Sequence, residues 1–123
     1  MVLVIGFNYL TSIYKFTGSK SVTDDSNFSI MTYNVRLFNK FNWLPNDSID
    51  KDIKTFVHKE NPTIICLQEY QPNDNFKLNN FYEHTYVMGN KVKSGQAIFS
   101  KYPILNSGVI KFPNSSNSAI YVD

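Results

Sequence analysis

The chain has 123 residues, of which 42% are hydrophobic and 18% are charged, and this length allows at most one domain. The formal net charge of +2 is too small to indicate nucleic-acid binding, which would require a basic stripe. The single cysteine, Cys66, excludes an internal disulfide. Because it lies within an apolar run, we predict that it serves as a small buried hydrophobic residue.

Residues 1–16 form an apolar N-terminal segment, and residues 17–27 form a polar linker. The apolar segment is shorter than the roughly 20 residues that span a bilayer, and it lacks the basic start of a signal peptide. Two interpretations stay open. The segment is either the end of a transmembrane helix, which would associate the protein with a membrane, or a disordered or surface-packed N-terminal helix.

Residues 28–35 alternate in the manner of a β-strand, with Thr32 and Asn34 on the same face. Asparagine is depleted in strands, so Asn34 near the strand end calls for an explanation. Its amide can orient a carboxylate or contact a phosphate oxygen, or it can satisfy a neighbouring loop. A loop carrying Trp43 is predicted to follow at residues 36–46.

Residues 47–60 have apolar side chains at helical spacing, and we predict a helix with Asp47 as its N-cap and Asn61-Pro62 as its end. Residues 63–67 then form a short apolar run that is typical of a buried strand.

Glu69 lies at the end of this apolar run. Burying a carboxylate there costs free energy unless a cation or hydrogen bonds compensate its charge. A strand, a helix and a second strand in sequence predict a parallel crossover unit. Such a unit places Asn34 beside Glu69 at one rim of the sheet, which is where α/β proteins carry their chemistry. The alternative is a solvated glutamate that only ends the strand.

Four further strands are predicted at residues 81–88, 96–100, 105–112 and 119–123. His58 and His84 are expected to be surface residues and not parts of an active site. The basic residues available to a polyanion, which we interpret as ordinary surface charge, are Arg36, Lys91, Lys93 and Lys101.

Three segments, in this order, resemble motifs of the endonuclease/exonuclease/phosphatase superfamily of metal-dependent phosphoesterases. They are Met31-Thr-Tyr-Asn-Val-Arg36, Pro62-Thr-Ile-Ile-Cys-Leu-Gln-Glu69 and Gly95-Gln-Ala-Ile-Phe-Ser-Lys-Tyr-Pro-Ile104. The resemblance covers residues 28–123 and implies an α/β fold. The expected architecture is the N-terminal half of a four-layer α/β sandwich, two facing β-sheets with outer helices, incomplete in this chain. The apolar N-terminus also resembles the membrane segments that precede this domain in some bacterial members, which predicts a membrane-associated bacterial protein.

The resemblance implies that Asn34 and Glu69 are catalytic and metal-binding residues, with Mg²⁺ or Mn²⁺ as the cofactor. The activity it implies is divalent-metal-dependent hydrolysis of a phosphodiester or phosphomonoester. The substrate would be a nucleic acid, a phospholipid or a small phosphoester.

The chain also departs from the family pattern. The second half of the family domain carries a histidine at a strand end, a Gly-Asp-x-Asn motif and a closing Asp-His pair, and none of them occurs in this sequence. We therefore expect a fragment that needs the missing C-terminal half and is inactive alone. The alternatives are a non-catalytic binding or assembly module derived from the same fold, or a structural membrane-proximal domain.

Overall fold

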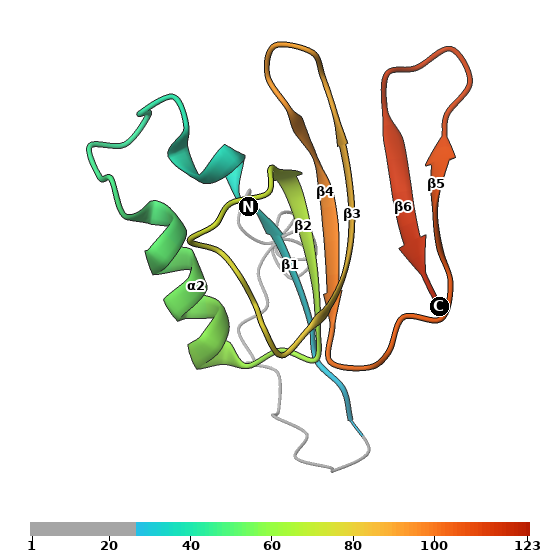
Figure 1. Ribbon diagram of the computed structural model, residues 1–123, viewed down its shortest axis with the longest axis horizontal. Helices are drawn as coiled ribbons and strands as arrows, with labels where there is room; N and C mark the ends of the chain where they lie inside the picture. Colours follow the sequence, from blue (N-terminus) through green and yellow to red (C-terminus); the bar gives the residue numbers. More distant parts are fainter. Residues whose placement is uncertain (1–26) are drawn as a thin grey trace, which may run out of the picture.

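A computed structural model describes residues 27–123, so the predicted N-terminal segment and all but the last residue of the predicted linker lie outside the described residues. The described part is mixed α/β, with a four-stranded sheet, a two-stranded sheet, one α-helix and one short 3-10 helix, η1 (Arg36–Asn39) (Figure 1). Within residues 27–123, no helix is long and apolar enough to cross a membrane.

The predicted crossover unit is confirmed. Strand β1 (Ile30–Asn34) and strand β2 (Ile64–Tyr70) run parallel, and helix α2 (Ile49–Glu60) connects them. The pairing places Asn34 opposite Gln68, so both strands end at the same rim of the sheet.

The ends of α2 show what the sequence predicted well and what it did not. Asn61 adopts the left-handed conformation (φ 48°) and donates its backbone N–H to the carbonyl of Val57, which ends the helix as predicted. The predicted N-cap was wrong, because Ser48 and not Asp47 precedes the first helical residue.

The four-stranded sheet has the order β1-β2-β4-β3, with β3 (Tyr82–Met88) and β4 (Ser94–Ser100) antiparallel. A hairpin of β5 (Ser107–Lys111) and β6 (Ser118–Val122) forms the second sheet. In Figure 1, α2 and this hairpin lie on opposite sides of the four-stranded sheet. This order of helix, sheet and second sheet is that of a partial α/β sandwich, as the sequence predicted.

The hydrophobic core lies between the four-stranded sheet and α2 and is closed by the segment that follows β2. Its buried members are Val35, Ile53, Val57, Ile65, Leu67, Tyr70, Phe76, Leu78, Ala97 and Phe99. Cys66 is not among them, so its prediction as a buried residue needs correction: it is half-buried. Strand alternation turns it away from Ile65 and Leu67, toward the less covered face of the sheet.

Candidate active site

The rim where β1 and β2 end brings together the two residues that the sequence singled out. Asn34 Nδ2 donates a hydrogen bond of 2.7 Å to Glu69 Oε1. The expectation that these residues are neighbours is confirmed. Both are exposed, so the pair is open to solvent and to a ligand.

The second half of the Asn34 amide is also engaged. Its Oδ1 accepts a hydrogen bond of 2.9 Å from the backbone N–H of Arg36. The side chain therefore does both things that the sequence left open, because it orients a carboxylate and satisfies a neighbouring loop. With both ends held, the amide presents its N–H groups and not its carbonyl to Glu69.

A β-bulge directs Glu69 to this rim. In the pairing of β2 with β4, Gln68 lies opposite Gln96 and Tyr70 lies opposite Gly95, so Glu69 is the extra residue. Regular alternation would point Glu69 into the core on the side of Leu67. With the bulge, Tyr70 takes the inward position and is only 2% exposed, while the Glu69 side chain turns outward.

The bulge has a conformational cost. Glu69 has a φ of 47°, in the left-handed region, where a residue with a side chain costs about 1–2 kcal/mol. The burial of Tyr70 and the hydrogen bond from Asn34 offset this cost. Strain that persists in a non-glycine residue at a rim is a feature of functional sites.

The pair lies in an open depression of about 420 Å³. Strands β3 and β4 contribute Tyr86, Met88 and Gln96 to its lining, and the segment that leads into β6 contributes Ser116 and Asn117. Gln96 Nε2 donates to the carbonyl of Ser118 at 2.7 Å, which ties the hairpin to the four-stranded sheet beside the site.

Glu69 is the single carboxylate among the residues that line this depression, and no histidine lines it. Its Oε2 has no hydrogen-bond partner within residues 27–123. A carboxylate oxygen facing solvent suits Mg²⁺, which takes one or two carboxylates and fills its remaining positions with water and substrate oxygens. The described residues contain no group of three or more His, Cys, Asp or Glu that could enclose a metal ion. Within residues 27–123, Glu69 therefore offers a single carboxylate at this rim, with room for water and substrate oxygens around it.

Gly95, which lies opposite Tyr70 in the pairing of β4 with β2, allows β4 to approach β3 closely. A Cβ atom on Gly95 would lie 1.9 Å from the Tyr86 carbonyl oxygen and 2.7 Å from Val87 Cα. Both are backbone atoms of β3, so neither can move without shifting the strand. The glycine at position 95, the first residue of the third family-like segment, is therefore required by the close packing of β4 against β3.

The match to known proteins agrees with this geometry. The model of the endonuclease/exonuclease/phosphatase family matches residues 31–122. The chain belongs to this family. Among curated proteins, none matches the chain. The family acts on phosphoesters and generally depends on divalent metal ions.

The two histidines lie outside the depression around Glu69. His58 is exposed in the last turn of α2, as predicted for a surface residue. His84 is half-buried on β3, opposite Ile98, and its Nε2 has no hydrogen-bond partner among the described residues. Neither lines the depression around Glu69, so neither can act there as a general base in this arrangement.

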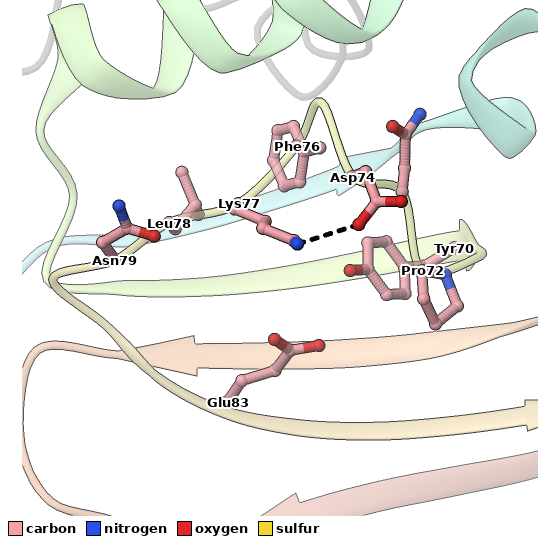
Figure 2. Close-up of a pocket in the computed structure, with 9 residues that line it drawn as sticks. Tyr70, Pro72, Asp74, Phe76, Lys77, Leu78, Asn79 and Glu83 are labelled. Atoms are coloured by element: carbon pink, nitrogen blue, oxygen red, sulfur yellow. Dashed lines mark ion pairs between the residues drawn. The ribbon is translucent and has the colours of Figure 1, made fainter.

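A slightly larger depression, of about 440 Å³, lies between β3 and the segment that follows β2 (Figure 2). Its charged groups are Glu83 and the exposed ion pair of Asp74 with Lys77, at 2.8 Å. Burial, together with the charge of Glu83 and a hydrogen bond to it, raises the pKa of the Tyr70 phenol far above its ordinary value. Tyr70 is therefore a neutral core residue.

Sequence reasoning missed the bulge at Glu69 and the reason for Gly95. A signal for the bulge was present. Apolar side chains at 65 and 67 predict the next inward residue at 69, but the next large apolar residue is Tyr70. Two polar residues in place of one, at the end of a buried strand, indicate an inserted residue.

Proposed function

We propose that this protein is a divalent-metal-dependent phosphoesterase in which Glu69 binds the catalytic Mg²⁺ or Mn²⁺. The observation that carries the proposal is the 2.7 Å hydrogen bond from Asn34 Nδ2 to Glu69 Oε1, at the rim where two parallel strands end. This contact holds one carboxylate oxygen of Glu69, whose side chain lines the open depression.

When bound, the metal ion supplies a Lewis acid that polarises a phosphoryl oxygen. The residues of this chain hold and orient the reactants. Asn34 fixes the rotamer of Glu69, and its second amide N–H is available to a phosphate oxygen. The role of Asn34 as a second metal ligand also stays a prediction. Its carbonyl oxygen, the atom that would bind the ion, already accepts a hydrogen bond from the backbone N–H of Arg36.

The proposed reaction needs groups beyond this pair. In-line attack on phosphorus requires a base or a group that orients the attacking water, and each such group contributes about 10²–10⁴-fold. The depression contains one carboxylate and no histidine from residues 27–123. We therefore assign hydrolysis to the complete catalytic domain and regard this chain as the part that carries the metal-binding glutamate.

The test is an assay of the protein extended through its natural downstream sequence. Bis(p-nitrophenyl) phosphate and p-nitrophenyl phosphate distinguish diester from monoester hydrolysis, with Mg²⁺ added or removed by EDTA. Glu69→Gln should lower kcat/KM by about 10³-fold, because the isosteric amide loses the charge that holds the metal. Glu60→Gln, at the exposed end of α2, is the matched control and should leave the rate unchanged. Undiminished Mg²⁺-dependent hydrolysis in Glu69→Gln would overturn the proposal.

One observation favours a second candidate, a non-catalytic binding module, namely the single carboxylate in the depression. This alternative predicts that the extended protein does not turn over either substrate. Turnover by the extended protein that Glu69→Gln abolishes would exclude it.

A further inference from the structure

The loop between β1 and α2 displays three large apolar side chains beside the candidate active site. Phe41 is 50% exposed, Trp43 is 46% exposed and Leu44 is 55% exposed. The rings of Phe41 and Trp43 are in contact, with centroids 5.1 Å apart. Trp43 and Leu44 also line a small hollow, of about 110 Å³, that includes Asn34. The apolar tip of the loop therefore adjoins the residue that orients Glu69.

This exposure is built into the loop and is not the result of a loose chain. The buried Asn39 side chain donates from Nδ2 to the carbonyls of Leu44 (2.8 Å) and Asn46 (3.1 Å). Its Oδ1 accepts from the backbone N–H of Leu44 at 3.0 Å. The Asn39 side chain thus donates two hydrogen bonds and accepts one, and these hold the loop in a fixed shape with its apolar residues outward.

The backbone of the same loop is strained. The four residues from Arg36 to Asn39 all have positive φ, between 45° and 61°. Such a conformation costs about 1–2 kcal/mol for each residue that has a side chain. These residues set the path of the loop, and its tip keeps Phe41, Trp43 and Leu44 in solvent, as an apolar patch that a partner can cover.

The charge of the loop is positive. Residues 36–46 contain Arg36 and Lys40 and no acidic residue. The Arg36 guanidinium carbon lies 4.8 Å from the centre of the Trp43 ring, and Lys40 Nζ donates to the neutral Gln71 Oε1 at 2.8 Å. Neither cation has an ion-pair partner within residues 27–123, so both charges remain available to phosphate groups.

We propose that this loop binds the surface of a phospholipid membrane. Phe41, Trp43 and Leu44 enter the boundary between headgroups and acyl chains, and Arg36 and Lys40 contact the lipid phosphates. The inference rests on the proposed function in one respect: a loop bound in this way brings the Glu69 site to phosphoesters presented at the membrane surface.

The composition of the loop favours a membrane over a single-stranded nucleic acid. A stacking platform needs free aromatic faces, but Arg36 already covers one face of Trp43 and Phe41 packs against that ring. Leu44, the most exposed of the three side chains, offers no face for a base. Leucine and tryptophan beside cations are instead the residues of an interfacial segment.

The chain offers a direct probe, because Trp43 is its single tryptophan. Tryptophan fluorescence of the full chain is recorded in EDTA, so that hydrolysis plays no part, with vesicles of phosphatidylcholine and phosphatidylserine. We expect a blue shift and a loss of quenching by acrylamide as Trp43 leaves water. With an oligothymidylate we expect no change. Failure of this test leaves the phosphoesterase assay unaffected, so the two proposals can fail separately.

Variants locate the binding surface. Phe41→Ser combined with Leu44→Ser, which keeps Trp43, should lower the vesicle partition coefficient by about tenfold or more. Leu105→Ser removes a more exposed apolar side chain (88%) from the connection after β4 and should leave the coefficient unchanged. Arg36→Gln with Lys40→Gln should reduce the preference for phosphatidylserine.

Three results would overturn the proposal. The first is a Trp43 that stays quenchable by acrylamide on vesicles, even if the chain is bound through another segment. The second is an equal effect of the loop and Leu105 variants on partition. The third is a fluorescence change with the oligonucleotide that matches or exceeds the change with vesicles.

Discussion

Strand β2 has two parts that differ in geometry and in what they do. From Ile64 to Leu67 its pairing with β1 and β4 is regular, and the inward side chains Ile65 and Leu67 are at most 1% exposed. From Gln68 to Tyr70 the register shifts, Glu69 has a positive φ, and its carboxylate is exposed. The regular part provides a rigid platform, and the irregular end presents a charged group in a fixed orientation. The cost of the irregular end is tolerable because the platform is well packed.

The largest expected effect is on the free energy of unfolding, and it distinguishes the regular part of β2 from its irregular end. Leu67→Ala should lower the free energy of unfolding by about 2–5 kcal/mol, since it leaves a cavity between the sheet and α2. Glu69→Ala removes an exposed side chain and should change it by less than about 1 kcal/mol. Urea denaturation of both variants measures the difference. Similar losses in both would contradict the division of β2 into a packed platform and an exposed end.

A second prediction concerns the close packing of β4 against β3 at Gly95, beside the irregular end of β2. Gly95→Ala should cost about 1–3 kcal/mol, because the added methyl group meets the backbone of β3. Gly108→Ala is the matched control: there the methyl group meets the side chain of Tyr121, which is 41% exposed and can move aside. Thermal denaturation should therefore show a much larger decrease in Tm for Gly95→Ala. An equal decrease in Tm for both variants would contradict this prediction, because it would mean that the β3 backbone shifts to accommodate the methyl group at position 95.

A third prediction concerns Asp50, which holds the segment after the bulge against α2. Its carboxylate accepts hydrogen bonds from Asn75 (2.8 Å), Asn73 (3.1 Å) and the backbone N–H of Lys51 (2.8 Å). Burial raises the pKa of Asp50, but these hydrogen bonds outweigh burial, so the pKa lies below its ordinary value.

A carboxyl group whose pKa is lower in the folded state stabilises the protein above its unfolded-state pKa. This stabilisation disappears as the pH falls through the folded-state pKa. Asp50→Asn should therefore be less stable than the parent chain by about 1 kcal/mol at neutral pH. The difference should shrink as the pH falls below about 4. Denaturation curves over this pH range test it, and a difference independent of pH would contradict the role given to the Asp50 charge.

The smallest expected effect has the opposite sign. Glu69→Gly relieves the left-handed strain and should raise the free energy of unfolding by about 0.5–1 kcal/mol, after allowance for the greater freedom of glycine in the unfolded chain. The same change removes the proposed metal ligand. Urea denaturation with a parallel Mn²⁺ titration would show a more stable protein that no longer binds the ion at this rim. A less stable Glu69→Gly would indicate that the bulge is not strained.

The platform was predictable from sequence because it depends on pattern. The alternation in residues 28–35, the helical spacing in 47–60 and the apolar run at 63–67 each specify an element, and their order specifies the parallel unit. The proximity of Asn34 and Glu69 followed from that unit. The partial exposure of Cys66 did not follow from the pattern, because it depends on what covers the second face of the sheet.

The bulge at Glu69 had a signal in the sequence that was missed, whereas the shape of the loop after β1 was not predictable because it depends on tertiary contacts. Among Arg36 to Asn39, only Asn39 is of a residue type that readily adopts the left-handed conformation, and its buried side chain holds the loop through residues further along the chain. The N-cap of α2 was placed one residue early because Asp47 and Ser48 are both good caps by type. The roles of Asn34 and Glu69 in catalysis stay predictions.

The most direct test of the central claim is paramagnetic broadening of backbone amide signals by Mn²⁺, which detects even weak binding to the chain. The account predicts that signals around Asn34 and Glu69 broaden at the lowest Mn²⁺ concentration. It also predicts that Glu69→Gln abolishes this effect, whereas Glu60→Gln preserves it. Broadening that begins elsewhere, or that persists around Asn34 in Glu69→Gln, would contradict the assignment of Glu69 as the metal-binding residue.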